Sequence, residues 1–379
     1  MLFSFESFLV ISCLVITGIY CFGMIWFISG IRSNDSIVCD QFKVSIVVAA
    51  RDEVNRIDGL LNDLYSQKHA FLEVIVVDDH SEDRTPQVVE NWCKKDSKYK
   101  LISLSGSRGK KAALTEGISK SKGDIILTTD ADCRVGPYWV STMVRYFTPE
   151  VGFVIGFSQS EKQKYNLRSS YEAIDFLALM ACIWGSWGHD YPMAASGQNL
   201  AFRKCVYDEV GGYSDIMHRV SGDDVLLLQK VRALDKWMTS FVDNPKGYAF
   251  HPCASSWRAL VNQRIRWASN APLMFRMAPF FFIYLSVVYL MNLFLLILPI
   301  LTLTGNFILW LVLVMLFSKS TVDWIIFSRI SGKVGRSDLK IFWPFWFLLQ
   351  PLFVVLVGFM GPLGLFRWKR RTQRFGRTL

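Results

Sequence analysis

The chain has 379 residues, of which 51% are hydrophobic and 20% are charged, and its formal net charge is +10. This is too apolar for an ordinary soluble domain and too charged for a bare membrane bundle, so we expect a soluble domain joined to membrane segments. The basic residues gather beside apolar segments, which favours the membrane over nucleic acid as the partner. The eight cysteines include no C-x-x-C pair, which argues against a disulfide framework or a zinc site.

An uncharged segment lies near the start of the chain. Residues 8–28 form a run of about 21 positions without a charge, long enough to span a bilayer. A signal peptide is the alternative, but no basic residue precedes the run and no small-x-small cleavage pattern is evident, which favours an anchor over residues 1–30. Arg32 follows it, and positive charge stays on the cytoplasmic side. We therefore expect residues 31–277 to form a cytoplasmic domain.

Strand-like and helix-like segments alternate through the first half of this domain. Strands are predicted at 44–50, 74–79, 101–104 and 123–132, with helices at 55–67, 86–92 and 111–120. Such alternation predicts an α/β domain with a parallel, doubly wound sheet. Its ligand should bind beyond the carboxyl ends of the strands.

The pattern becomes irregular beyond residue 151. A strand is predicted at 197–202 and a helix at 223–234. Residues 171–187 are apolar and aromatic but include Glu172 and Asp175, so we expect a helix under the site or at the membrane surface rather than a span. Residues 256–277 predict one helix with four arginines among apolar residues, which suits a membrane interface.

Three further apolar segments lie within residues 278–366, at about 279–302, 305–327 and 341–364. A cytoplasmic loop between the second and third is indicated by Lys319, Arg329, Lys333, Arg336 and Lys340. The basic tail 367–379 is also expected to be cytoplasmic, yet three full spans would place it outside. The third segment contains Pro344, Pro351, Gly358, Gly361 and Pro362. A broken or re-entrant helix is therefore the alternative to a third span.

Two aspartates one residue apart follow the strand in 123–132. Alternate side chains of a strand point to the same side, so Asp130 and Asp132 can face one hard cation, Mg²⁺ or Mn²⁺. A solvated turn after the strand is the alternative, because Asp-x-Asp is common by chance.

Carboxylates also follow the first two strands and open a later helix. Asp52, Glu53 and Asp79 can accept hydrogen bonds from a nucleotide base and ribose, although acidic residues also favour helix N-termini. Asp223 and Asp224 can supply a general base, because one carboxylate raises the pKa of the other. A helix cap is the alternative for this pair.

Two basic motifs complete the set. The loop 108–111 lacks the spacing and the hydroxyl residue of a nucleotide-binding P-loop, although Lys110 or Lys111 can face a diphosphate. Gln263, Arg266 and Trp267 share one helix face. There arginine can clamp a phosphate and tryptophan can stack on a sugar ring, unless the helix merely lies on a membrane.

The order of these motifs resembles the membrane-bound, inverting family 2 glycosyltransferases with the GT-A fold, among them cellulose synthases, poly-N-acetylglucosamine synthases and glycolipid-forming enzymes. The resemblance covers about residues 42–270 and depends most on Q-x-x-R-W at 263–267 following Asp-x-Asp. Segments 197–203 and 211–213 are also similar to family segments, and 368–371 resembles a Trp-Lys-Gly-Arg tail of membrane members.

The resemblance implies roles for individual residues. The nucleotide sugar would be held by Ala50, Arg51, Asp52, Glu53, Asp79, Lys110, Asp130 and Asp132, the last two through the metal. The diphosphate and the acceptor would be held by Gln263, Arg266 and Trp267. Asp224 would deprotonate the acceptor hydroxyl. Asp223 is the alternative base, because family members often carry Glu-Asp where this chain has Asp223-Asp224.

We therefore predict inverting transfer from a nucleotide sugar, with UDP favoured over GDP, to a lipid-linked or other membrane-proximal glycan acceptor. The protein would be a multi-pass protein of the cell's inner membrane, with its catalytic domain cytoplasmic and no nucleic-acid partner. One alternative is a processive polysaccharide synthase, for which the membrane segments are few unless additional membrane subunits contribute helices. Another is a catalytically inactive scaffold.

Overall fold

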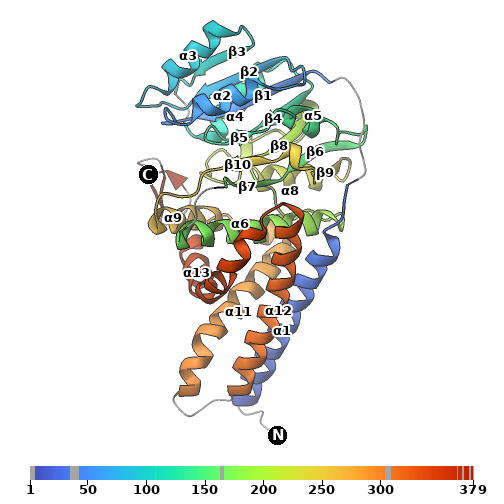
Figure 1. The fold of residues 1–379 in the computed structure, drawn as a ribbon, viewed down its shortest axis with the longest axis vertical. Helices are drawn as coiled ribbons and strands as arrows, with labels where there is room; N and C mark the ends of the chain where they lie inside the picture. The colour runs from blue at the N-terminus through green and yellow to red at the C-terminus, as the bar shows by residue number, and fades with distance from the viewer. Residues whose placement is uncertain are drawn as a thin grey trace.

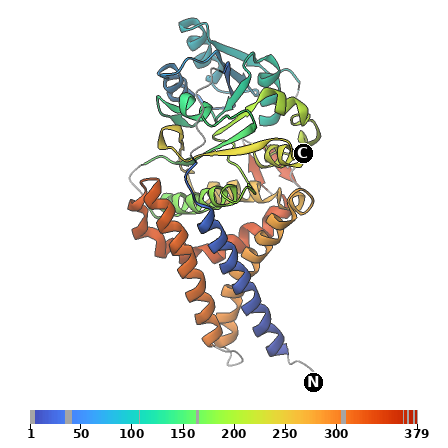
Figure 2. The same ribbon diagram turned by 90° about the vertical axis from the view of Figure 1, so that its right-hand side faces the viewer.

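The computed structural model places an α/β domain on a stalk of long helices (Figure 1). It describes residues 5–34, 42–106, 108–162, 166–303, 309–364, 366–368, 371–374 and 377–378. The chain begins at the far end of the stalk, whereas its last described strands lie beside the domain (Figures 1 and 2).

A mixed sheet forms the centre of the domain. Within the described residues it has seven strands, in the order β3 (Tyr99–Ser103), β2 (Glu73–Asp78), β1 (Val44–Ala50), β4 (Ile125–Thr128), β8 (Leu200–Arg203), β6 (Val151–Gly156) and β9 (Met238–Val242). The first four are parallel, but β8 runs antiparallel to both of its neighbours. The prediction of a parallel sheet, made from the first half of the domain, is thus correct for β1 to β4, and β8 adds an antiparallel strand. Gln198 lies beside Thr129 at the carboxyl end of β4, so the chain enters β8 from that edge and runs back.

Helices cover both faces of this sheet, because successive side chains of a strand point to opposite sides. Ile46 and Val48 pack in one core cluster with α2, α3 and α5, and Val47 packs in the other with α4, α7 and α8. These helices are α2 (Ile57–Tyr65), α3 (Thr85–Lys95), α4 (Lys110–Lys120), α5 (Trp139–Val144), α7 (Lys204–Glu209) and α8 (Val225–Ala233). Short 3₁₀ turns occur at Ser214–Ile216, Pro245–Gly247 and Ser337–Phe342.

A smaller sheet and one long helix separate the main sheet from the stalk (Figure 1). The small sheet contains β5 (Arg134–Val135), β10 (Ala249–His251) and β7 (Ser158–Ser160). Helix α6 (Leu167–Trp187) runs across the top of the stalk in both views (Figures 1 and 2). This placement agrees with the prediction of a helix beneath the site instead of a span.

Three long helices run side by side through the stalk (Figures 1 and 2). They are α1 (Phe5–Gly30), α11 (Pro279–Leu303) and α12 (Leu309–Lys333). The sequence predicted that Lys319 lies in a cytoplasmic loop, but this prediction is wrong. Lys319 is fully buried in α12 and pairs with Asp323, which also accepts a hydrogen bond of 2.6 Å from Tyr20 Oη on α1. This polar cluster therefore joins α1 to α12 inside the stalk.

Helix α13 (Trp343–Leu363) lies across the stalk near its junction with the domain, packed against α6, α9 and α11 (Figures 1 and 2). By length and composition, four helices in the described part of the chain could cross a membrane, and α13 is one of them. Its crosswise course returns the chain to the domain side, where β11 (Phe366–Trp368), β12 (Arg371–Arg374) and β13 (Arg377–Thr378) follow. Lys369 and Arg370 of the basic tail lie outside the described residues. Helix α13 is continuous from Trp343 to Leu363, so the last apolar segment is not broken, and a re-entrant helix and a third span both stay predictions.

The arginine-rich segment before the stalk is two helices, not one as predicted. Helix α9 (Trp257–Ala268) ends at Ser269, and α10 (Ala271–Met277) begins after Asn270. Pro272 lies in the first turn of α10, where its missing N–H is tolerated. In the interior of a continuous helix over 257–277, the same proline would interrupt the hydrogen bonding. The break lets α9 follow the domain while α10 leads into α11.

The domain and the stalk are tied together by close backbone approaches and by one buried cation. A Cβ atom on Gly30, Gly185 or Gly188 would collide with backbone where the end of α1 crosses α6, so these positions need glycine. Arg336 is fully buried after α12 and donates from Nη1 to Ser160 O at 2.9 Å, on β7. The small sheet is therefore anchored directly to the end of α12.

Candidate active site

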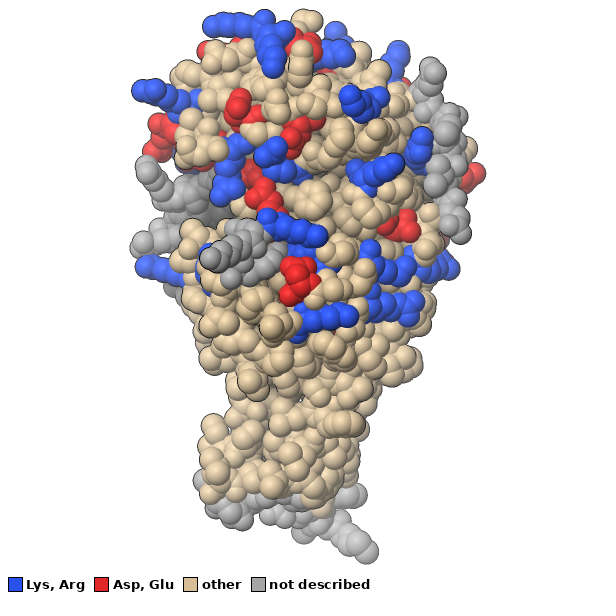
Figure 3. All heavy atoms as spheres, in the orientation of Figure 1, with Lys and Arg blue, Asp and Glu red and all other residues tan. Residues whose placement is uncertain are grey.

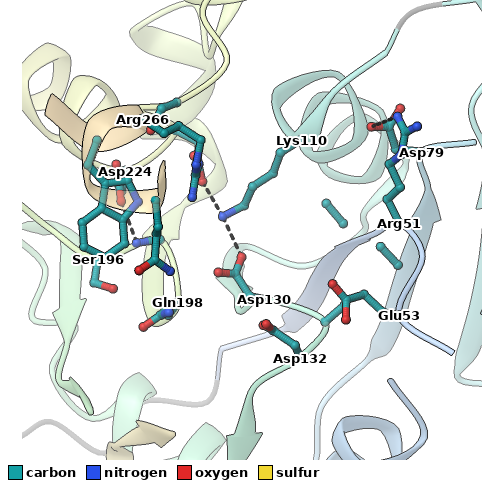
Figure 4. Close-up of a pocket in the computed structure, with 18 residues that line it drawn as sticks. Arg51, Glu53, Asp79, Lys110, Asp130, Asp132, Ser196, Gln198, Asp224 and Arg266 are labelled. Atoms are coloured by element: carbon teal, nitrogen blue, oxygen red, sulfur yellow. Dashed lines mark hydrogen bonds and ion pairs between the residues drawn. The ribbon is translucent and has the colours of Figure 1, made fainter. Parts of the chain in front are cut away.

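A cleft of about 1000 Å³, including the part open to solvent, lies at the carboxyl ends of β1, β2 and β4. Figure 4 shows its walls converging from the sheet edge, from the loops before β8 and α8, and from α9. Twelve residues predicted from the sequence line it: Ala50, Arg51, Glu53, Asp79, Lys110, Asp130, Asp132, Asp223, Asp224, Gln263, Arg266 and Trp267. The structure thus brings together positions that are more than 200 residues apart in the chain.

Asp52 is the predicted residue that the structure does not place in this cleft. Its backbone has a φ of 51°, and its Oδ1 accepts a hydrogen bond of 2.8 Å from the Glu82 backbone N–H. Its own N–H donates to Ser81 Oγ at 3.0 Å. Asp52 therefore ties the loop after β1 to the loop after β2, while Glu53 lines the cleft.

Lys110 joins the two sides of the cleft (Figure 4). Its Nζ lies 2.7 Å from Asp130 Oδ1 and 2.7 Å from Asp223 Oδ2. Burial by itself would lower the pKa of Lys110, but the attraction of Asp130 and Asp223 outweighs it and raises that pKa. The ammonium group is therefore charged at neutral pH and holds the end of β4 against the loop before α8.

Asp223 and Asp224 are adjacent, yet their surroundings drive their pKa values apart. Burial would raise the pKa of Asp223, but the charges of Lys110 and Lys111 lower it overall. Burial and the Asp223 charge raise the pKa of Asp224. Asp224 accepts hydrogen bonds from the Gly197 N–H at 2.9 Å and the Val225 N–H at 2.7 Å, which fix its orientation. A carboxylate pair divided in this way is consistent with the prediction that Asp224 is the proton acceptor.

Asp130 and Asp132 offer oxygen atoms that can share one cation. With Cys133 they form a group whose candidate ligand atoms all lie within 4.8 Å of one another. Burial and the two carboxylate charges raise the pKa of the Cys133 thiol, and a thiol is a soft ligand that Mg²⁺ and Mn²⁺ do not favour. The donor set that remains is two carboxylates, which fits Mg²⁺ or Mn²⁺ and does not fit zinc.

Six lining residues were not predicted as site residues: Ala49, Ala131, Ser196, Gly197, Gln198 and Ser221. The oxygen Oε1 of Gln198 is buried and finds no hydrogen-bond partner among the described residues. An orphaned polar atom in a cleft indicates a ligand contact. The sequence did hold a signal for Gly197 and Gln198. They open segment 197–203, which resembles a segment of family 2 glycosyltransferases.

A family model identifies the domain. Residues 45–205 match the model of glycosyl transferase family 2. They form a family 2 glycosyltransferase domain. Poly-beta-1,6-N-acetyl-D-glucosamine synthase of Staphylococcus epidermidis is 24% identical over 230 residues, which are 60% of this chain and 54% of the relative. The synthase of Staphylococcus aureus (strain MSSA476) is 24% identical over 240 residues, with the same shares of each chain.

A solved structure resembles nearly the whole chain. It is the mannosyltransferase PcManGT from Pyrobaculum calidifontis in complex with GDP-Man and Mn²⁺, with a TM-score of 0.58 and 17% identity. The match covers 93% of this chain and 98% of that one. At this identity the likeness speaks for the fold alone.

The glycosyltransferase domain has the predicted GT-A fold with flanking helices, so the fold class and the family resemblance are confirmed. This chain spans about half the length of the curated relatives it matches. The family model ends at residue 205, before Asp224 and the Gln263–Trp267 segment. The roles of the site residues therefore remain predictions from their geometry.

Gly197→Ala should impair sugar transfer, because a Cβ atom at this position would lie 2.8 Å from Asp223 Oδ2 and 3.1 Å from Lys110 Nζ. Displacing these groups by a fraction of an ångström should lower the turnover rate by about 10- to 100-fold. Gly136→Ala is the matched control, since its Cβ would meet nothing closer than Lys246 O at 4.0 Å. Equal turnover rates for the two variants would contradict the close approach at Gly197.

Proposed function

We propose that the protein transfers a sugar from a nucleotide-sugar donor to a hydroxyl group of a membrane-linked acceptor, with inversion at the anomeric carbon. The observation that carries this proposal is the position of Asp224, a carboxylate of raised pKa, across one cleft from Asp130 and Asp132. Asp223 is engaged by Lys110, which leaves Asp224 as the base. One base and no covalent intermediate give a single displacement and therefore inversion.

The donor would lie along the sheet edge, with its nucleotide toward Arg51, Glu53 and Asp79 and its diphosphate toward Asp130. Asp132 and Asp130 would hold Mg²⁺ or Mn²⁺, which when bound neutralises negative charge on the diphosphate. Lys110 and Arg266, which also line the cleft, would supply further positive charge for the diphosphate.

Asp224 would accept the proton of the acceptor hydroxyl as its oxygen bonds to the anomeric carbon. The bond from that carbon to the diphosphate breaks, and the nucleoside diphosphate leaves with the electron pair. Trp267 offers a flat apolar surface for a sugar ring beside this reaction centre.

We place the catalytic domain on the cytoplasmic face of the inner membrane. Figure 3 shows a band of Lys and Arg side chains just above the stalk and none over the visible face of the stalk itself. Arg32 at the end of α1, and Arg329 and Lys333 at the end of α12, lie at this junction. Positive charge beside membrane helices favours the cytoplasmic side. An acceptor embedded in that leaflet would approach the cleft past α9 and α10.

A processive polysaccharide synthase is the second candidate, favoured by the names of the two Staphylococcus relatives. Three side-by-side helices are few for a sugar channel, so export would require additional membrane subunits. The solved neighbour binds GDP-Man and Mn²⁺. GDP-sugars therefore belong beside UDP-sugars as candidate donors.

Membranes containing the protein should release a nucleoside diphosphate from one member of a panel of UDP- and GDP-sugars and should add the sugar to a lipid extract. Asp224→Asn should reduce this release by about 1000-fold or more while leaving donor binding nearly intact, because it removes only the base. The wild-type rate should rise with pH, since the base works when ionised and its pKa is raised. Normal turnover of Asp224→Asn would exclude this residue as the base, and a ladder of products would favour the polysaccharide synthase.

Treatment with EDTA should stop transfer, and added Mg²⁺ or Mn²⁺ should restore it, if Asp130 and Asp132 bind a cation. Asp132→Asn should raise the metal concentration needed for half-maximal rate by about 10-fold or more, because one of two carboxylate ligands is lost. Asp208→Asn, on the exposed surface of α7, serves as the control. Full activity in EDTA would remove the metal from the mechanism.

Cys205 tests the orientation, because it is exposed on the domain, whereas the other described cysteines are buried or half-buried. Cys39 lies outside the described residues, so the test uses a Cys39→Ser variant. In this variant, a membrane-impermeant maleimide should label inverted vesicles and leave right-side-out vesicles unlabelled. Cys205→Ser should abolish the label. Labelling of right-side-out vesicles alone would reverse the proposed orientation.

A further inference from the structure

Arg264 is a buried cation that touches two residues of the cleft without lining the cleft itself. Its relative exposure is 5%, and its guanidinium lies 4.2 Å from the centre of the Trp267 ring. Its Nη1 donates a hydrogen bond of 2.6 Å to Gln263 Oε1. Gln263 and Trp267 both line the cleft. One side chain therefore contacts two of the three residues on the α9 wall.

Arg264 is held in turn by helix α6. Its Nε donates to Asp175 Oδ2 at 2.8 Å, and both side chains are largely removed from solvent. The next residue of α6, Phe176, packs its ring 6.0 Å from that of Trp267. The helix that crosses the top of the stalk thus supports the α9 wall through an ion pair and an aromatic contact.

The contact with Arg264 selects which end of the Gln263 amide meets a ligand. A guanidinium group can only donate hydrogen bonds, so the atom it contacts on Gln263 must be the oxygen. The amide nitrogen, which donates, is then the group of Gln263 that remains for the cleft. A donor suits diphosphate or sugar oxygens, whereas the amide oxygen in the same place would repel a diphosphate.

We propose that Asp175 and Arg264 are positioning residues that set the Gln263 amide and the Trp267 indole for catalysis. This inference rests on the proposed glycosyl transfer and extends it to two residues outside the cleft. Neither residue touches the substrate, and both act through Gln263 and Trp267. Asp175 also balances the buried charge of Arg264, since an unpaired buried cation would be unstable.

The test is a double-mutant cycle on the full-length protein in membranes, with nucleoside diphosphate release as the rate. Asp175→Asn removes the charge but keeps a hydrogen-bond acceptor of the same size, and should lower kcat by about 10-fold with little change in the KM for the donor. Gln263→Ala should lower kcat by about 100-fold, and adding Asp175→Asn to it should cost clearly less than the about 10-fold of Asp175→Asn alone, because residues that act through one another are not additive and only the route through Trp267 remains. Asp175→Glu should recover part of the loss.

Glu73→Gln is the control, because it removes another buried carboxylate of an ion pair, with Lys100, at the opposite end of the strands. It should leave kcat unchanged. Multiplicative losses in the double variant, or a wild-type kcat for Asp175→Asn, would overturn the positioning role while leaving the proposed function intact. If the wild-type protein releases nucleotide from no donor in the panel, the proposed function fails, and this inference fails with it.

Discussion

The cleft depends on one ammonium group, that of Lys110, placed between the carboxylates of Asp130 and Asp223. These two ion pairs join the carboxyl end of β4 to the loop before α8. They therefore connect the side of the cleft proposed for the donor to the side proposed for the acceptor. Of the three charges, Asp223 is buried, and a buried charge persists only when it is paired. Burial and the charge of the neighbouring Asp223 raise the pKa of Asp224, which increases its capacity to accept a proton.

Two helices, α6 and α13, connect the cleft to the stalk. Helix α6 lies between the cleft and the stalk, and it supplies Asp175 to the buried Arg264 behind the α9 wall. Helix α13 passes beneath α9 and α6 rather than along the stalk, so the chain returns to the domain side. A cleft bounded in this way can receive a soluble donor from one side and an acceptor from the membrane plane on the other.

Much of the first half of the domain could be predicted, because strand and helix periodicities are properties of neighbouring residues. The strands ending at Ala50 and Asp78 and the helix beginning at Lys110 lie within a few residues of their predicted positions. The errors occur where distant contacts decide. Lys319, predicted to lie in a loop, is buried because Asp323 and Tyr20 provide partners inside the stalk. The direction of β8, for which the sequence made no prediction, follows from the contact between Gln198 and Thr129.

The sequence by itself determined which chemical groups are present and in what order: the Asp130–Asp132 pair, the Asp223–Asp224 pair and the Gln263, Arg266 and Trp267 face. Only the tertiary structure decided what each group does with its neighbours. It separated the pKa values of Asp223 and Asp224, turned Asp52 out of the cleft and brought Asp175 to Arg264. The physical reason is that charge pairing and burial act through space, between residues that lie far apart in the sequence, whereas periodicity acts along the chain.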